Sequence, residues 1–362
     1  MLFWRDLSGY FESLGFEANP CDPCVMNKMI DGKQMTVVWH VDDIKMSHVS
    51  PKAIDWLIEK LNEKYGKVSP LTVQRGKKLE HLGMELDYSK KGKVSLDMQK
   101  HIQSILAAAA SDMDGLAETP AASHLFQTRT DAKSMSREQA DLFRTMVAKI
   151  LFVACRSRPD LKLALAFLTT RVRNPDLDDH RKLARLVRYI RATRSLRLTL
   201  EASSMTKISW WIDAAYGVHD DMRGHSGGMM SFGRGAVGSR SSKHKINSRS
   251  STEAEIIGVD DHMSSVLWTL RFLHAQGYEI EENVTYQDNQ SAILLEKNGK
   301  FSSSKRTKHI DMRYFFITDR IEKKEVSVEY CPTEEMIGDF YTKPLQGSLF
   351  RKFRALILNL NE

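Results

Sequence analysis

The chain has 362 residues, of which 42% are hydrophobic and 27% charged, and this length and balance are typical of a soluble protein with two or three domains. The formal net charge of +7 suits a polyanionic partner. The sequence shows neither a signal peptide nor about 20 consecutive apolar residues, so we expect an intracellular protein, cytoplasmic or nuclear, with no membrane contact.

The cysteines do not form the pattern of a disulfide framework. They stand at four scattered positions, Cys21, Cys24, Cys155 and Cys331. The first two have the spacing of a zinc knuckle, but no second ligand pair follows them at a suitable distance. Reduced, buried thiols are therefore the favoured interpretation.

The first part of the chain predicts a helix, a hairpin and a second helix. Residues 2–16 carry apolar residues at helical spacing. The strands on either side of Asp31 and Gly32 form a hairpin, because Asp-Gly is a common two-residue turn. Residues 51–67 again place apolar residues at helical spacing.

Asp42 and Asp43 interrupt an otherwise apolar segment, residues 37–44. Spacing alone favours a second turn with the two aspartates at its tip.

The middle of the chain predicts a hairpin, a linker and a group of helices. A hairpin precedes a helix that starts at Gln99, and residues 111–136 have the composition of a linker. Helical spacing returns from Ser136, and Pro159 divides this stretch into two helices. A third helix follows with basic residues on its exposed face, which is more often a solvated face than a binding groove.

A short strand from Lys207 to Tyr216 ends on a carboxylate. Alternation puts Ile208, Trp210 and Ile212 on one face and Asp213 on the other. By itself an aspartate at a strand exit is most simply a turn residue.

A second acid lies on a helix that begins after Ser250 and stops at Gly277. With Ser250 as the N-cap, Glu253 takes the capping-box position and has a structural role. Glu255 lies two residues further on, roughly 200° around the helix. Glu255 is therefore the better candidate for chemistry.

Two further acids follow later elements. Asp288 stands where a strand over residues 284–286 ends and a helix begins, and Asp339 lies on a short helix that starts at Pro332. We also expect a turn at residues 233–235 between two strands, a helix over residues 308–325 with Ile310, Tyr314, Phe315 and Ile317 facing inward, and an amphipathic C-terminal helix.

Four carboxylates that meet at one sheet edge repel each other strongly unless cations lie between them. Two hard cations a few ångströms apart activate water and stabilise the leaving oxygen in phosphodiester hydrolysis. The sequence is thus compatible with a two-ion hydrolytic site at Asp213, Glu255, Asp288 and Asp339.

The order strand-Asp, helix-Glu, strand-Asp, helix-Asp resembles the ribonuclease H (RNase H) fold. The motifs SSTEAE, DNQSA, RTKHID and TKPL are similar to those of copia-type retrotransposon Pol polyproteins, in their reverse transcriptase and RNase H region. The resemblance implies an α+β RNase H-like domain whose four acids bind two Mg²⁺ or Mn²⁺ ions and cleave the RNA of RNA-DNA hybrids. It also implies other parts of the Pol polyprotein as partners. Two positions depart from the common pattern, Ala215 and Gly338.

The pair Asp42 and Asp43, preceded by DPCV, resembles the palm hairpin of a reverse transcriptase, with His40 in place of the usual tyrosine. Nucleotidyl transfer needs a further aspartate, which in this family lies upstream of the hairpin, and a fingers region. We therefore expect a chain that begins inside the palm and lacks polymerase activity. The expected domains are residues 1–115 (palm and thumb-like), 116–204 (linker and connection), 205–346 (RNase H-like) and 347–362 (C-terminal helix).

Basic residues cluster near two of the predicted nuclease elements, where they are expected to contact the hybrid: Arg240, Lys243, Lys245, Lys305, Arg306, Lys308 and His309. His309 is equally well explained as a capping or buried histidine. The alternative to an enzyme is a non-catalytic, nucleic-acid-binding remnant of a retroelement. Both alternatives predict a basic surface, and only cleavage of a hybrid separates them.

Overall fold

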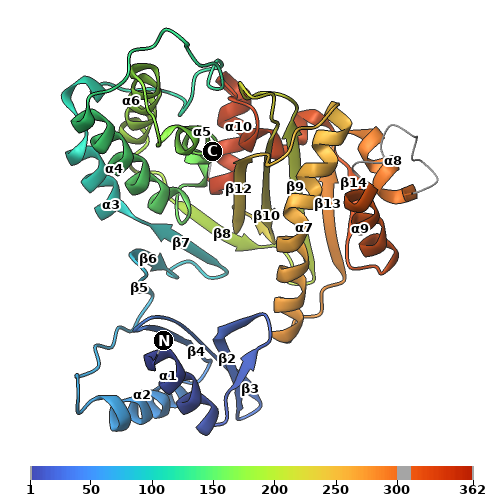
Figure 1. Ribbon diagram of the computed structural model, residues 1–362. Helices are drawn as coiled ribbons and strands as arrows, with labels where there is room; N and C mark the ends of the chain where they lie inside the picture. Colours follow the sequence, from blue (N-terminus) through green and yellow to red (C-terminus); the bar gives the residue numbers. More distant parts are fainter. Residues whose placement is uncertain (1, 300–310, 361–362) are drawn as a thin grey trace. The chain divides into compact units, whose positions relative to one another are not determined.

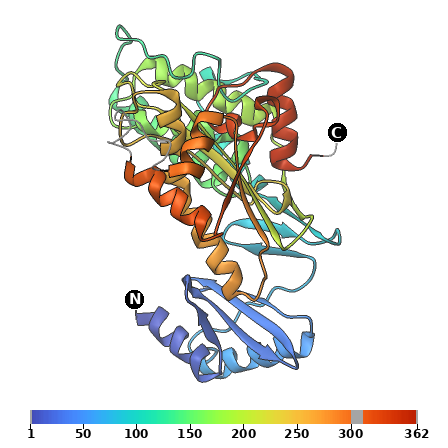
Figure 2. The same ribbon diagram turned by 90° about the vertical axis from the view of Figure 1, so that its right-hand side faces the viewer.

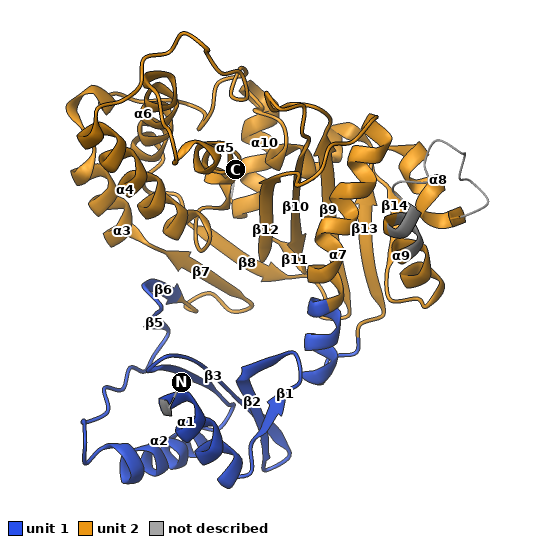
Figure 3. Ribbon diagram, in the orientation of Figure 1, with its two compact units in different colours: residues 1–86, 268–279 blue, residues 87–267, 280–362 orange. Residues whose placement is uncertain are grey.

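The computed structural model, which describes residues 2–299 and 311–360, confirms the predicted mixture of helices and sheets (Figures 1 and 2). The chain forms two compact units, residues 1–86 with 268–279 and residues 87–267 with 280–362 (Figure 3). The long helix α7 (Ser251–Ala275) contributes residues to both. In the described residues, no helix combines the length and apolar character needed to cross a membrane.

The first unit is an antiparallel sheet covered by helices. Its order is β1 (Glu17–Asn19), β2 (Asp22–Ile30), β3 (Lys33–His40) and β4 (Asp43–Ser47), and its helices are α1 (Leu2–Ser13) and α2 (Pro51–Tyr65). The predicted turn between β2 and β3 is confirmed, since Asp31 and Gly32 have φ of 50° and 70°, as a type I′ turn requires. Leu7, Phe11 and Leu57 join the core between helices and sheet.

The second unit begins with helices that flank a small antiparallel sheet. The strands of this sheet within the second unit are β7 (Lys93–Asp97), β8 (Leu198–Ala202) and β11 (Gly233–Arg234). Two strands that precede β7 in the chain, β5 (Lys78–His81) and β6 (Met84–Asp87), belong to the first unit except for Asp87. The helices are α3 (Gln99–Ala108), α4 (Arg137–Ala154), α5 (Lys162–Arg171) and α6 (Leu177–Ala192), with short 3₁₀ turns η1 (Ser111–Met113) and η2 (Pro159–Leu161). The predicted break at Pro159 is confirmed. Residues 233–235 lie, as predicted, in the connection between two antiparallel strands, β10 (His225–Ser231) and β12 (Gly238–Lys243). Within this connection Gly233 and Arg234 also pair with β8, as the short strand β11.

A buried ion pair holds the break between α4 and α5. Arg158 and Asp160 are fully buried, and Arg158 Nε donates to Asp160 Oδ1 at 2.8 Å. Tyr189 Oη donates to Asp160 Oδ2 at 2.8 Å, and Arg158 Nη1 donates to the carbonyl of Thr193 at 3.0 Å. Since every charge in this group is paired, the helices around it are held in one arrangement.

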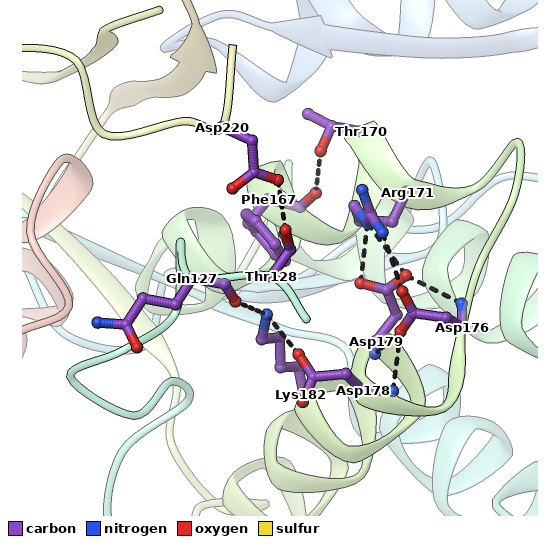
Figure 4. Close-up of polar contacts among 10 residues, drawn as sticks. All are labelled: Gln127, Thr128, Phe167, Thr170, Arg171, Asp176, Asp178, Asp179, Lys182 and Asp220. Atoms are coloured by element: carbon purple, nitrogen blue, oxygen red, sulfur yellow. Dashed lines mark hydrogen bonds and ion pairs between the residues drawn. The ribbon is translucent and has the colours of Figure 1, made fainter. Parts of the chain in front are cut away.

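Side-chain caps fix the next connection (Figure 4). Asp176 accepts from the backbone N–H groups of Asp178 and Asp179 at the start of α6. Arg171, at the end of α5, donates to Asp179 at 3.0 Å and to Asp176 at 3.1 Å. The capping carboxylates therefore serve both the helix start and the turn between two helices.

The sequence favoured a solvated basic face on the helix that is now α6. In the structure, two arginines of this helix instead have partners on the backbone. Arg188 donates to the carbonyls of Asp112 and Asp114, and Arg191 donates to the carbonyls of Met113 and Gly115. These arginines hold the start of the linker against α6, because a guanidinium can satisfy several backbone carbonyls at once.

The main sheet of the second unit has the order β12-β10-β9-β13-β14. Its strands are β9 (Lys207–Ala215), β10 (His225–Ser231), β12 (Gly238–Lys243), β13 (Glu282–Gln287) and β14 (Ser327–Tyr330). β10 runs antiparallel to β9 and β12, whereas β13 is parallel to β9 and β14. This mixed sheet with flanking helices is consistent with an RNase H-like domain.

Connections over this sheet carry the remaining elements. They are α7, α8 (Gln290–Asn298), α9 (Asp311–Glu322), the 3₁₀ turns η5 (Thr333–Glu335) and η6 (Ile337–Tyr341), and α10 (Gly347–Leu358). The helix predicted from Pro332 is therefore two separate 3₁₀ turns, joined at Met336. Of the residues predicted to face inward from α9, Ile317 is fully buried. Ile310 and the side chains of Tyr314 and Phe315 lie outside the described part of the chain.

Candidate active site

Asp213 lies near the end of the central strand β9, with its side chain 1% exposed. Its neighbours Ile212 and Ala214 point to the opposite face of the sheet. There Gly258 of α7 packs so closely on β9 that an added Cβ would lie 3.1 Å from the Cβ of Ala214. Thr342 Oγ1 donates a hydrogen bond to Asp213 Oδ2. The predicted strand thus delivers a buried carboxylate to the edge of the sheet.

Glu255 reaches the same edge from α7. Ser250 accepts from the N–H of Glu253 at 3.2 Å, and Glu253 in turn accepts from the N–H of Arg249 at 2.7 Å, so Glu253 caps the helix as predicted. Glu255 Oε2 accepts from the N–H of Ala214 at 3.0 Å. The cap therefore fixes the first turn of α7, and with it the position of Glu255.

Asp288 follows β13 directly and completes a group of three. One ligand atom each from Asp213, Glu255 and Asp288 lies within 4.8 Å of the other two. Thr333 Oγ1 donates to Asp288 Oδ2 at 3.0 Å, and Gln287 Nε2 donates to Glu255 Oε2 at 3.3 Å. Each carboxylate is thus held by at least one neutral donor, which leaves other oxygen lone pairs for a cation.

Asp339 lies on η6, beside Asp213 but outside this group of three. Lys343 Nζ is 2.7 Å from Asp339 Oδ1 and 3.7 Å from Asp213 Oδ1. Gly338 packs so closely on β9 that an added Cβ would be 3.0 Å from the Cβ and the N of Asp213. The glycine that departs from the common family pattern therefore lies at a close contact between η6 and β9.

The site holds its protons more tightly than carboxyl groups in water. Burial raises the pKa of Asp213, opposed by Lys343 and the hydrogen bond from Thr342. Burial, Asp213 and Asp288 raise the pKa of Glu255 well above its ordinary value. Burial and Asp213 raise the pKa of Asp339 to about 7. Added positive charge would therefore stabilise the ionised forms.

Lys343 responds in the opposite sense. Burial alone would lower the pKa of its ammonium group, but the carboxylates of Asp213 and Asp339 raise it above its ordinary value. Lys343 therefore remains charged at neutral pH.

Sequence reasoning assigned no role to Lys343, Thr342 or Gln287. Lys343 follows Asp339 by four residues, the spacing at which opposite charges meet on a helical turn. This spacing could have predicted the ion pair between them. Thr342 and Gln287 had no such signal, because their contacts are made across the fold.

A pair of stacked aromatic rings lies on the two strands that lead to Asp213 and Asp288. Trp211 and Tyr286 pair across β9 and β13, and their rings stack with centroids 5.2 Å apart. Trp211 precedes Asp213 by two residues on β9, so these two side chains share a face of the sheet. Tyr286 precedes Asp288 by two residues, at the end of β13. Both rings are partly exposed.

Asp42 and Asp43 lie in the first unit, at the turn between β3 and β4, and both are exposed. Val41 adopts φ of 59° there, and Asp43 Oδ2 accepts from the N–H of Leu82 at 3.2 Å. The predicted turn is present, but its two residues are Val41 and Asp42, whereas Asp43 begins β4 and pairs with His40. Across the described ranges, the group of three acids that could hold an ion is the one at Asp213 and does not include this turn.

The predicted nucleic-acid contacts are only partly described. Arg240 and Lys243 lie on the edge strand β12 and point to opposite faces, since they are three positions apart. Arg240 donates to the carbonyl of Asp261 at 3.1 Å, and Lys243 Nζ is 2.7 Å from Asp221 Oδ2. Lys245 is exposed. The predicted contacts at Lys305, Arg306, Lys308 and His309 lie outside the described residues.

The sequence is similar to those of transposon Pol polyproteins along almost its whole length. It is 26% identical to the retrovirus-related Pol polyprotein from transposon TNT 1-94 of Nicotiana tabacum over 98% of the chain and 27% of that protein. It is 25% identical to the corresponding polyprotein from transposon RE1 of Arabidopsis thaliana over 98% of the chain and 24% of that protein. The putative transposon Ty5-1 protein of Saccharomyces cerevisiae is 24% identical over 73% of the chain and 85% of its own length.

These matches confirm the resemblance to copia-type Pol polyproteins. The chain spans about a quarter of the length of the first two relatives. No family model and no solved structure matches the chain.

Proposed function

We propose that this chain is a reverse transcriptase and RNase H fragment of a retrotransposon Pol polyprotein, and that its second unit hydrolyses the RNA strand of RNA-DNA hybrids. The observation that carries the proposal is the convergence of Asp213, Glu255 and Asp288 within 4.8 Å. These residues come from a strand, a helix and a second strand, the order expected for an RNase H fold.

The donor set fits a hard divalent cation. All three side chains offer carboxylate oxygens, the ligands that Mg²⁺ and Mn²⁺ prefer. Burial raises the pKa of both Asp213 and Glu255, so a cation would remove an unfavourable concentration of negative charge. Asp213, Glu255 and Asp288 would hold this ion, which when bound supplies Lewis-acid activation of water and charge stabilisation at the phosphorus.

The residues around the acids keep them in place for this task. Ala214 and Gln287 donate to Glu255, Thr342 to Asp213, and Thr333 to Asp288. Such neutral donors orient a carboxylate without adding charge, and they maintain ligand geometry between binding events. The side chains would therefore need little reorganisation to bind an ion.

Hybrid binding is assigned to basic residues near the site. Lys245 is exposed and is free to contact a phosphate. Arg240 and Lys243 already have partners on the protein, so each would contact phosphates less strongly than Lys245. We keep Lys305, Arg306, Lys308 and His309 in the proposed interface on their sequence motif. Binding through such residues should weaken steeply as salt rises. Other parts of the Pol polyprotein are further proposed partners.

The proposed chemistry does not include polymerisation. Asp42 and Asp43 resemble the palm aspartates of a reverse transcriptase, but both are exposed at a turn and no third acid in the described ranges groups with them. Two-ion nucleotidyl transfer needs a more complete set of ligands. We expect no primer extension by this chain.

The test is to incubate the full chain and Mg²⁺ with four substrates: an RNA-DNA hybrid, single-stranded RNA, double-stranded RNA and a primed template with nucleotides. Cleavage of the hybrid RNA alone, abolished by EDTA, is the expected result. Salt-sensitive binding without cleavage would contradict the proposal and support a non-catalytic remnant. Primer extension that depends on Asp42 would contradict the exclusion of polymerase activity.

A further inference from the structure

Lys343 places a cation inside the acidic cluster. Among the described residues, Asp213 and Asp339 each form an ion pair with its ammonium group. The distances from Lys343 Nζ are 3.7 Å to Asp213 Oδ1 and 2.7 Å to Asp339 Oδ1. Asp213 and Asp339 are almost completely buried, whereas the lysine side chain is 41% exposed. The ammonium group therefore lies within ion-pair distance of two buried carboxylates, on a side chain that is itself partly exposed.

The four acids form two overlapping sets. Asp213, Glu255 and Asp288 converge within 4.8 Å, and Asp213 and Asp339 converge on Lys343. Asp213 belongs to both sets. This is the arrangement expected of two neighbouring cations that share one carboxylate, but in one of the two sets the cation is an amino group.

We propose that Lys343 is the second cation of the site, and that the chain binds one divalent ion, at Asp213, Glu255 and Asp288. This inference rests on the proposed function and replaces the two-ion site that the family resemblance implied. Asp339 then holds the lysine and does not ligate a metal ion.

The backbone around Lys343 is fixed on both sides. The preceding residue, Thr342, is buried and bonds to Asp213. The N–H of Lys343 donates to the carbonyl of Asp339 at 2.8 Å, and the N–H of Leu345 donates to the carbonyl of Lys343 at 2.7 Å. Lys343 thus starts from a rigid position, and its ammonium reaches the two carboxylates through side-chain torsions alone.

An ammonium group differs from a divalent ion in ways that an experiment can detect. It carries a single charge and three N–H donors, accepts no ligands, and is present at any metal concentration. A site with one ion and one lysine should therefore fill with metal non-cooperatively. Removing the amino group should open a place for a second ion between Asp213 and Asp339.

The experiment counts Mn²⁺ ions bound to the full chain by electron paramagnetic resonance, without nucleic acid. The wild type should bind one ion. Lys343→Met, which keeps the length of the side chain but not its charge, should bind two, and their proximity should give a spin-coupled signal. Lys343→Arg keeps the charge and should bind one. The double variant Lys343→Met with Asp339→Asn should also return to one, because the second set has lost a carboxylate.

Two coupled ions in the wild type, or a single ion in Lys343→Met with native circular dichroism, would overturn the proposal. If Lys343→Met does not fold, Lys343→Gln replaces it, alone and together with Asp339→Asn. Two ions in Lys343→Gln and one in the wild type, in Lys343→Arg and in Lys343→Gln with Asp339→Asn would support the proposal. Two ions in the wild type or in Lys343→Arg, or one ion in Lys343→Gln, would refute it. Mg²⁺ titrations of hybrid cleavage should be hyperbolic for the wild type and sigmoidal for Lys343→Met.

The ion count separates this inference from the proposed function. A wild type that binds one ion and a Lys343→Met variant that binds two would uphold the role of Lys343 even if no hybrid were cleaved. Hybrid cleavage by a wild type that holds two ions would instead uphold the nuclease and reject the lysine.

Discussion

Replacing Glu255 with glutamine should stabilise the protein when divalent ions are absent. Glu255 is 6% exposed, and burial, Asp213 and Asp288 raise its pKa well above 4.5. The folded state therefore binds this proton more tightly than the unfolded chain does. The stability from this group is complete below pH 4.5 and is lost as the pH rises toward the folded-state pKa.

The size of the effect follows from the two states open to Glu255 near neutral pH. Staying protonated about 3 pH units above the ordinary pKa costs about 4 kcal/mol, at about 1.4 kcal/mol per unit. Ionising costs a similar amount, since two like charges within 4.8 Å of each other repel by at least roughly 3 kcal/mol at an effective dielectric constant of about 20. Glutamine avoids both costs but weakens the hydrogen bonds from Ala214 and Gln287 by about 1 to 2 kcal/mol. The expected gain is about 2 kcal/mol.

The assay is urea unfolding at about pH 7.5 in EDTA, and the matched control is Glu253→Gln. Glu253 lies on the same helix and serves as its cap, a role that glutamine can also fill, so the control should change the free energy of unfolding by less than about 1 kcal/mol. Mg²⁺ should stabilise the wild type and the control but not Glu255→Gln. A Glu255→Gln variant less stable than the wild type in EDTA would show instead that the carboxylate stabilises the fold.

Three other predictions concern the site and its support. Asp288→Asn should abolish hybrid cleavage, because it removes a metal ligand. Hybrid affinity, measured by fluorescence anisotropy, should stay unchanged or rise slightly, because the lost negative charge no longer repels the phosphates. Cleavage at the wild-type rate would show that Asp288 is only a turn residue. The Mg²⁺ concentration for half-maximal cleavage should fall as the pH rises from about 6 to about 8, because protonated Glu255 is a poor ligand, and an unchanged requirement would argue against this. Asp160→Asn should lower the free energy of unfolding by about 3 to 5 kcal/mol, since it leaves Arg158 charged and buried. Asp141→Asn, in an exposed pair, should cost less than about 1 kcal/mol, and equal losses would contradict the role of burial.

Much of the candidate site could be predicted from local pattern. Asp213 and Asp288 follow strands whose apolar character is plain in the sequence, and Glu255 is distinguished from Glu253 by the rule for a helix cap. The meeting of these three acids depends on the order of strands in the sheet, which the family resemblance supplied. Side-chain period and strand order were sufficient here, because each acid stands at the end or start of a regular element.

Contacts made across the fold were not predictable in this way. Thr342 reaches Asp213, and the arginines of α6 reach carbonyls of the linker. A threonine or an arginine has no spacing signature for such partners, which are set by tertiary packing. The short strand β11 was missed for the same reason, since Gly233 pairs with a strand about thirty positions earlier in the chain, at Ala202, and glycine has little strand preference of its own.

The most direct test of the nuclease assignment is the chemistry of the product ends. A hybrid labelled in its RNA strand should be cut by the full chain with Mg²⁺ to fragments with 3′-hydroxyl and 5′-phosphate ends, because the account has water attack the phosphorus in line with the 3′ oxygen as leaving group. Asp213→Asn prepared in parallel should give no fragments. Cyclic 2′,3′-phosphate ends, or cutting that persists in Asp213→Asn, would come from attack by the RNA's own 2′-hydroxyl or from another site, and would contradict the account.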